Sequence, residues 1–388
     1  MEAHVCRILG LWMVWSCALA FPLHAASMPE PKQIRDCSTY RRVPRKIRSY
    51  DIGRQAPRGL EHHSDATGPT VYFGSTDHYV YALDALTGEL RWRFGTGDHV
   101  RSSPVIADGV LYVGSHDAGL YALDAEKGTL LWRFPTCGWV WSTPWIEGER
   151  VFSLSWDNTL YALDARDGSL AWRHDAMTYG ASRPFVQDGR VFLTNDAPYI
   201  WALDAETGRL LWKTYIGNRV RSSPVAVDGM VYVGTNSAEL LALDAATGDI
   251  VWRYPARGWI WSTPWIEGDR LYVGTRGKEV LCLDRRTGRR LWRFETDGFV
   301  DGSPLLIDGV VYIGSHDRHL YALDADSGAL VWSFEAEGFI TTTPAFHAGR
   351  IYITSYDRHL YVLSAKDGDL LWSFEAGDWI TSSPAIGE

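Results

Sequence analysis

ALDAETGRLLW, residues 202–212, decides the fold of this chain of 388 residues, because close copies of it recur at a constant interval. The copies follow one another every 40 residues, without a single insertion. A constant period of this length indicates identical supersecondary units arranged in a stack or a ring. The tryptophans that end the copies are Trp92, Trp132, Trp172, Trp212, Trp252, Trp292, Trp332 and Trp372.

Each copy is typical of a β-hairpin. The apolar residues at its start are strand formers, the Asp and the following Thr-Gly or Asp-Gly form a tight turn, and the Leu-Leu-Trp begins the returning strand. A turn position that requires a positive φ explains why glycine is present in every copy. These glycines are Gly88, Gly128, Gly168, Gly208, Gly248, Gly288, Gly328 and Gly368.

The complete unit is seen in residues 102–135, SSPVIADGVLYVGSHDAGLYALDAEKGTLLWRFP. It contains four strand candidates, SPVIA, VLYVGS, LYALD and TLLWRF, with turn signals at Asp108-Gly109, His116-Asp117 and Lys127-Gly128. Four antiparallel strands in a unit of this size make one blade of a β-propeller. A solenoid of stacked repeats is the competing architecture.

The two ends of the repeat region favour a closed ring. The first unit begins at Thr70, and residues 62–67, HHSDAT, do not resemble the expected first strand. The last unit is followed by TSSPAIGE, residues 381–388, which is an additional first strand. An open array would instead need polar caps at both ends. We therefore expect an all-β, eight-bladed propeller over residues 68–388, closed by the C-terminal strand that completes the first blade.

The repeated tryptophans are expected to be structural wedges between blades. Burying one tryptophan removes enough surface from water to contribute roughly 4 to 6 kcal/mol, before chain entropy offsets most of it. We therefore do not interpret these eight side chains as a ligand site.

Residues 1–26 are typical of a secretory signal peptide. Arg7 precedes an apolar run over residues 8–21, and small residues follow, with cleavage expected after Ala25 or Ala26. The mature protein would then be periplasmic or secreted. The alternatives are a retained membrane anchor and a lipoprotein modified at Cys17, although Trp15 fits a lipoprotein signal poorly.

Three cysteines, Cys37, Cys137 and Cys282, would remain after cleavage. An odd number at scattered positions is not a disulfide framework, so at most one bridge is expected, in spite of an oxidising compartment. The sequence leaves open whether Cys37 pairs with Cys137 or with Cys282.

Residues 27–67 form a basic arm that precedes an acidic body. Within it, residues 29–60 carry a net charge of +6, whereas residues 61–388 carry −15. The arm could bind an anionic lipid surface or another polyanion. Alternatively it is a solvated linker, or it folds back onto the acidic body. The acidity of that body argues against nucleic-acid binding.

The recurring motif resembles the tryptophan-docking motif of the pyrroloquinoline quinone (PQQ) repeat family, over residues 70–388. Residues 202–212 match Ala-x-Asp-x-x-Thr-Gly-x-x-x-Trp completely. Other copies match closely, but Cys282 and Val362 replace the alanine and Ser364 replaces the aspartate. WD-type repeats would require Trp-Asp, whereas Arg, Lys or Ser follows the tryptophan here.

The resemblance implies one of two kinds of protein. Quinoprotein dehydrogenases oxidise alcohols or sugars with PQQ and calcium, whereas ligand-free scaffolds resemble the outer-membrane assembly lipoprotein BamB. The chain lacks the adjacent Cys-Cys pair common in the alcohol-oxidising enzymes, their long insertions and a haem-binding CxxCH. The fold alone does not choose between the two branches.

Strand polarity predicts that the linkers entering each first strand share one face of the ring with the loops after the second strands. Arg101 and Trp141 recur as Arg221 and Trp261, either because three blades were duplicated or because these side chains bind a ligand. The candidate ligand-binding or partner-binding residues at this mouth are Arg101, Trp141, Arg221, Trp261, Asp301, His116, Trp156 and His316. Their varied chemistry on different blades predicts no metal site.

These observations favour an exported, non-enzymatic scaffold that acts as a monomer, needs no cofactor and binds a protein or another component of the cell envelope. The first alternative is a dehydrogenase that uses PQQ with calcium, in which Asp301 would be the base while Arg101 and Arg221 hold the quinone carboxylates. The second alternative is a propeller that binds a carbohydrate or a small anion through its tryptophans and arginines.

Overall fold

A computed structural model describes residues 58–64 and 68–387 of the protein, and this part of the chain is built from strands and turns. The chain divides into residues 1–33 and residues 34–388, and every described residue belongs to the second unit. The expected signal peptide, Cys37 and most of the basic arm lie outside the described residues. No helix long and apolar enough to cross a bilayer occurs in the described ranges.

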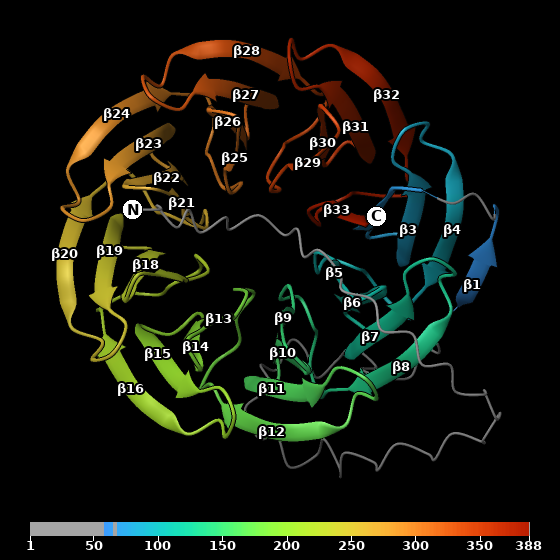
Figure 1. Cartoon of the computed structure of the whole chain (residues 1–388), viewed down its shortest axis with the longest axis horizontal. Coiled ribbons are helices and arrows are strands. Elements are labelled where there is room, and N and C mark those ends of the chain that lie inside the picture. Colours follow the sequence, from blue (N-terminus) through green and yellow to red (C-terminus); the bar gives the residue numbers. More distant parts are fainter. Residues whose placement is uncertain (1–57, 65–67, 388) are drawn as a thin grey trace, which may run out of the picture. The chain divides into compact units, whose positions relative to one another are not determined.

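Eight antiparallel sheets follow one another around a ring (Figure 1). Seven of them have four strands in sequence order, from β5-β6-β7-β8 to β29-β30-β31-β32, and the eighth has the order β33-β2-β3-β4-β1. The prediction of an eight-bladed all-β propeller, closed by the C-terminal strand, is therefore confirmed. In Figure 1 the C-terminal β33 lies beside the first strands of the repeat region, at the inner side of the blade.

The innermost strand of each blade has three residues. These strands are β5 (Val105–Ala107), β9 (Trp145–Glu147), β13 (Phe185–Gln187), β17 (Val225–Val227), β21 (Trp265–Glu267), β25 (Leu305–Ile307), β29 (Ala345–His347) and β33 (Ala385–Gly387). The second strands are β2 (Thr70–Gly74), β6 (Val110–Gly114), β10 (Arg150–Ser155), β14 (Arg190–Thr194), β18 (Met230–Gly234), β22 (Arg270–Thr275), β26 (Val310–Gly314) and β30 (Arg350–Thr354).

The third strands carry the first residues of each docking motif. They are β3 (Tyr79–Asp84), β7 (Gly119–Asp124), β11 (Thr159–Asp164), β15 (Tyr199–Asp204), β19 (Glu239–Asp244), β23 (Glu279–Asp284), β27 (His319–Asp324) and β31 (His359–Ser364). The outermost strands carry the docking tryptophans. They are β4 (Leu90–Gly95), β8 (Leu130–Pro135), β12 (Leu170–Asp175), β16 (Leu210–Tyr215), β20 (Ile250–Pro255), β24 (Arg290–Glu295), β28 (Leu330–Glu335) and β32 (Leu370–Glu375).

Burial within a blade explains its sequence pattern. The second and third strands are covered on both faces by the neighbouring blades, so β6 and β7 are almost continuously apolar and buried. The outermost strand has one free edge, and β8 accordingly mixes exposed and buried positions. The blade cores are thus sandwiched between consecutive sheets around the ring.

The first blade has a fifth strand that the sequence analysis assigned to the arm. β1 (Gly59–His62) pairs antiparallel with the outer edge of β4, so that His62 lies opposite Trp92. Glu61 forms an ion pair with Arg93 of β4 and accepts a hydrogen bond from the Tyr79 hydroxyl. The arm therefore joins the sheet before the first repeat begins.

Each docking tryptophan packs on the glycine turn of the following blade. The ring of Trp92 lies against Gly128, whose φ is +70° and where a Cβ atom would be 2.6 Å from the indole. The turn is held by Asp124, whose Oδ1 accepts the backbone N–H of Lys127 at 2.8 Å. Glycine is therefore required both for the left-handed backbone and for the close approach of the indole.

Seven indole N–H groups also donate to a backbone carbonyl of the next blade, at 2.9–3.2 Å. The pairs are Trp92 with Ala125, Trp132 with Ala165, Trp172 with Ala205, Trp212 with Ala245, Trp252 with Arg285, Trp292 with Ala325, and Trp332 with Ala365.

The seam between the last and first blades differs from the other seven. The ring of Trp372 lies on Gly88, but its buried Nε1 has no hydrogen-bond partner among the described residues. The Ala85 carbonyl accepts a hydrogen bond from the Tyr352 hydroxyl at 2.7 Å, just as the Ala125 carbonyl accepts one from Tyr72 at 2.8 Å. The closing seam thus keeps the tyrosine hydrogen bond that other seams also have, and lacks the hydrogen bond from the indole.

The cysteines of the described part differ from each other. Cys282 is a free, buried thiol on β23, and burial raises its pKa to about 12. Cys137 is disulfide-bonded. Cys282 occupies the place of the motif alanine, opposite Trp292, and is therefore a small apolar core residue.

Replacing Trp212 with Phe should destabilise the protein by about 1 kcal/mol more than replacing Trp372 with Phe. Both substitutions remove similar apolar surface, but only the Trp212 indole donates a hydrogen bond, to Ala245. Urea unfolding followed by circular dichroism measures the difference. Equal losses for the two variants would show that the docking hydrogen bond contributes nothing.

Candidate functional site

The linkers from each fourth strand to the next first strand share one face with the loops between second and third strands, as strand polarity predicts. Eight loop N–H groups donate to linker carbonyls at 2.7–3.1 Å, which ties the two sets together around the ring. We call this the mouth face. The donor and acceptor residues are His116 and His99, Trp156 and Trp139, Asp196 and Tyr179, Asn236 and Arg219, Arg276 and Trp259, His316 and Phe299, Tyr356 and Phe339, and Thr76 and Trp379.

The aspartate in the mouth loops has a structural role in five blades. Asp117 accepts hydrogen bonds from the Gly97 N–H of the preceding linker and from the Tyr121 hydroxyl, and it is almost fully buried. Asp77, Asp157, Asp317 and Asp357 make the same two kinds of contact. These carboxylates are therefore fully engaged in holding the linkers and are not free ligands.

Four of the candidate residues form one aromatic cluster. His116 stacks on Trp139 with ring centroids 4.5 Å apart, and Trp141 stacks on Trp156 at 5.5 Å. The Arg101 guanidinium lies over the Trp141 ring at 5.3 Å. The residues predicted from the sequence are thus neighbours in space. Trp139, which was not predicted, also belongs to this cluster.

This cluster contains buried polar atoms that lack partners. Arg101 Nε, His116 Nε2 and Trp156 Nε1 have no hydrogen-bond partner within the described ranges. Burial lowers the pKa of His116 to about 3, with smaller contributions from Arg101 and His99, so its imidazole is neutral at physiological pH. A ligand or partner that accepts hydrogen bonds would satisfy such groups.

The duplicated arginine has a different environment. Arg221 forms a two-point ion pair with Asp196, with Nε to Oδ1 at 2.8 Å and Nη2 to Oδ2 at 3.2 Å. Its guanidinium also lies 4.7 Å from the Trp261 ring, whose N–H donates to Asn236. The position that corresponds to Asp196 in front of Arg101 is Thr76, which explains why Arg101 has no carboxylate within 4 Å among the described residues.

Asp301 lies at the centre of a third group. Arg276 binds both of its carboxylate oxygens at 2.9 and 2.7 Å, and His316 Nε2 lies 2.9 Å from Oδ2. Burial tends to raise the pKa of Asp301, but the hydrogen bonds from His316 and Arg276 outweigh it and leave that pKa below its usual value. The Arg276 guanidinium packs on Trp261, 3.2 Å from the ring centroid, and so joins this group to the previous one.

Sequence reasoning missed a ring of aromatic side chains on the linkers, two residues before the positions it selected. Trp259, Phe299, Phe339 and Trp379 are exposed on the mouth face, and Trp139 and Tyr179 are half-buried there. The signal was present in the 40-residue period, because six of the eight copies carry Trp, Phe or Tyr at this position.

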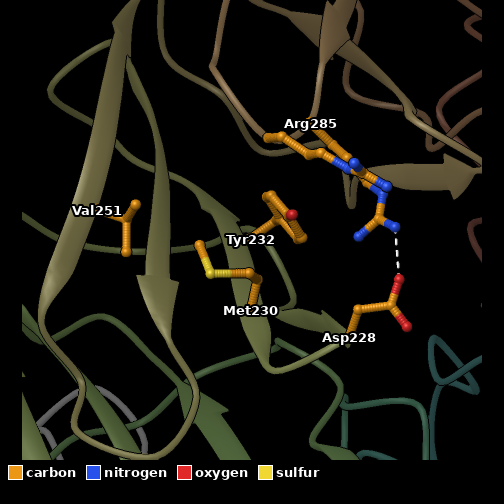
Figure 2. Close-up of a pocket in the computed structure, with 6 residues that line it drawn as sticks. Asp228, Met230, Tyr232, Val251 and Arg285 are labelled. Carbon is orange, nitrogen blue, oxygen red and sulfur yellow. Dashed lines mark hydrogen bonds and ion pairs between the residues drawn. The ribbon is translucent and has the colours of Figure 1, made fainter.

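The opposite face holds a small cavity of about 300 Å³ between two blades (Figure 2). Met230, Tyr232 and Val251 line it, and Arg285 closes it through an ion pair with Asp228. Arg285 also donates to the Gly268 carbonyl at 2.6 Å. Arg285 and Asp228 are thus already paired with each other, whereas the buried Tyr232 hydroxyl has no hydrogen-bond partner among the described residues.

The family model described as outer membrane protein assembly factor BamB matches residues 76–182, 177–259, 224–307, 255–338 and 279–386. No curated protein matches the chain.

Solved structures share the fold at low sequence identity. BamB from Moraxella catarrhalis superposes with a TM-score of 0.64 and 20% identity, covering 76% of this chain and 92% of that one. The computationally designed Ika8 protein gives 0.67 and 16%, covering 84% and 98%. The quinohemoprotein alcohol dehydrogenase ADHIIG from Pseudomonas putida HK5 gives 0.62 and 16%, covering 73% and 67%.

The Asp301 group should contribute to stability in a pH-dependent way. Because the folded-state pKa of Asp301 is lowered, its contribution is complete above about pH 4 and is lost as the pH falls through that folded-state pKa. Asp301→Asn should therefore cost about 1–3 kcal/mol at pH 7 and less at pH 3.

Urea unfolding at both pH values measures this difference. Asp269→Asn is the control, because Asp269 pairs with Arg286 at the exposed surface and should matter by less than about 0.5 kcal/mol. An Asp301→Asn effect that is equally large at pH 3 and pH 7 would contradict the ionic interpretation.

Proposed function

Because the chain belongs to the family of outer membrane protein assembly factor BamB, we propose that it is an exported, non-enzymatic scaffold that binds a protein partner of the cell envelope through its mouth face. In this proposal residues 1–26 direct export, and the basic segment 29–60 can add contact with an anionic surface. The propeller acts as a monomer without a cofactor.

The observation that carries the proposal is the exposure of large aromatic side chains on one face. Trp259, Phe299, Phe339 and Trp379 are 47%, 41%, 45% and 48% exposed. All four lie on linkers of the mouth face, held in place by the linker-to-loop hydrogen bonds. Aromatic residues are enriched at the energetically important centres of protein interfaces, where burial in a complex replaces contact with water.

The charges of the mouth indicate what such a partner should carry. Arg221 and Arg276 are neutralised by Asp196 and Asp301, whereas Arg101 has no carboxylate within 4 Å in the described part of the chain. Arg101 lies against Trp141, and a cation held on an aromatic ring is well placed to bind a carboxylate that arrives with the partner. The proposed partner surface is therefore apolar with at least one acidic side chain.

The mouth residues do not fit the dehydrogenase alternative well. Asp301 would have to act as a base, but Arg276 and His316 already hold both of its oxygens. Arg221, proposed for a quinone carboxylate, is occupied by Asp196. We therefore derive no catalytic step through PQQ and calcium, and we propose that the protein needs neither.

Site-specific photo-crosslinking in the intact cell envelope tests the proposal. A photoreactive phenylalanine at Phe339 or Trp379 should give a discrete adduct with an envelope protein. The same probe at Leu211, which is exposed on the outermost strand β16, should not. Arg101→Glu should reduce the mouth adduct severalfold, whereas Arg209→Glu, on a turn of the opposite face, should leave it unchanged.

Adducts from Leu211 alone would move the partner site to the outer strands. If instead no adduct forms, and the purified protein binds PQQ with calcium in a way that Arg101→Ala abolishes, the dehydrogenase alternative would replace the proposal.

A further inference from the structure

We propose that His78, Asp98 and His99 form a binding site for a divalent transition-metal ion on the mouth face of the first blade. This inference goes beyond partner binding and does not depend on it. One ligand atom from each of the three side chains lies within 4.8 Å of the others, and all three residues are half-buried. His78 comes from the loop between β2 and β3, and Asp98 and His99 come from the linker after β4.

The repeat makes this cluster more informative than an isolated group would be. The positions equivalent to His78 in the other blades are Ala118, Asn158, Pro198, Ala238, Lys278, Arg318 and Arg358. Those equivalent to Asp98 are four glycines, Thr178, Asn218 and Asp378, and those equivalent to His99 are six aromatic residues and Arg219. Only the first blade thus carries a metal-ligating residue at all three positions, and the fold brings the three together.

The type of ligands selects the metal. Two imidazoles and one carboxylate suit Zn²⁺, Co²⁺, Ni²⁺ or Cu²⁺, whereas Ca²⁺ and Mg²⁺ prefer sites built from oxygen ligands. Three protein ligands leave a fourth position for water or for a group of the partner. His78 Nε2 lies 4.0 Å from Asp98 Oδ1, so a shift of about 0.5 Å would bring them to the separation of two ligands on one ion.

His99 is oriented by a neighbour, as metal-binding histidines usually are. Its Nδ1 contacts the Thr76 backbone carbonyl and therefore carries the ring proton. In the neutral ring Nε2 then has a free lone pair, and a backbone carbonyl on the other nitrogen is the usual second contact of a ligating histidine. Asp98 uses Oδ1 to accept the His99 N–H at 2.7 Å, which fixes the linker turn.

Arg58 competes with a metal ion for the imidazole of His78. The Arg58 guanidinium lies 3.1 Å from His78 Nδ1 and donates to it. Binding at Nε2 therefore moves the ring proton to Nδ1 and displaces Arg58 from that nitrogen.

A further imidazole lies beside the cluster. The rings of His99 and His116 are 5.9 Å apart, and the buried Nε2 of His116 has no hydrogen-bond partner in the described ranges. The site therefore sits at the edge of the aromatic cluster that contains Arg101 and Trp141.

Titration of the tag-free, chelator-treated protein with Co²⁺ and with Zn²⁺ tests the site. We expect one ion per chain, and for Co²⁺ a visible ligand-field absorption typical of mixed nitrogen and oxygen ligands. His78→Ala and His99→Ala should each weaken binding at least about tenfold. Arg58→Ala should tighten it, because the competing hydrogen bond to His78 is removed.

His359→Ala is the matched control, since His359 follows the equivalent loop in the eighth blade, and it should leave the affinity unchanged. Circular dichroism confirms that each variant is folded, and His78→Gln replaces His78→Ala if the smaller side chain disturbs the loop. Absence of stoichiometric binding, or binding that survives both His78 and His99 substitutions, would overturn the proposal. Neither result would affect the crosslinking test of the partner site.

Discussion

The packing of each tryptophan on the glycine turn of the following blade is the contact on which the rest of this structure depends. Within one copy of the motif, Gly128 packs against the preceding blade and Trp132 packs against the following blade. Two residues close in sequence therefore form two different blade interfaces. The indole of Trp92 fills the space above Gly128, and its N–H satisfies the Ala125 carbonyl. Repetition of this contact aligns the sheets, and β33 then closes the array by pairing with β2.

A frame held in this way leaves the mouth face free to vary. The linkers and loops are fixed through backbone hydrogen bonds and through buried aspartates such as Asp117, so the neighbouring side chains can change without loss of the fold. This variation has produced three different groups of side chains on the mouth face. They are the aromatic cluster around Arg101, the paired charges of Arg221 and Asp301, and the histidines of the first blade. Their diversity is the physical basis for assigning recognition to this face.

The fold could be predicted from the sequence because the 40-residue period, the turn glycines and the additional C-terminal strand can all be recognised from residues that are close together in the sequence. The site could be predicted only in part. Trp141, Trp156 and His116 were selected and do meet, but the pairing of Arg221 with Asp196 and of Arg276 with Asp301 joins residues 25 positions apart on different blades. Whether such residues form ion pairs depends on the curvature of the ring and on the length of the side chains, which the sequence pattern does not give. β1 was missed because Gly59–His62 has no repeat signature, and its pairing depends on the free edge of β4.

The central claim is that contacts between blades close a ring, and that this ring supports the mouth face. Deletion of residues 381–388 tests this claim most directly. Hydrogen exchange of the β2 amides, together with the thermal midpoint, should be compared between the full chain and the truncated one. The account predicts that β2 loses its protection and that the midpoint falls by several degrees or more, because the edge of β2 and the surface beneath β33 become exposed to water. Unchanged protection of β2 and an unchanged midpoint would contradict closure by β33 as the constraint that holds the ring.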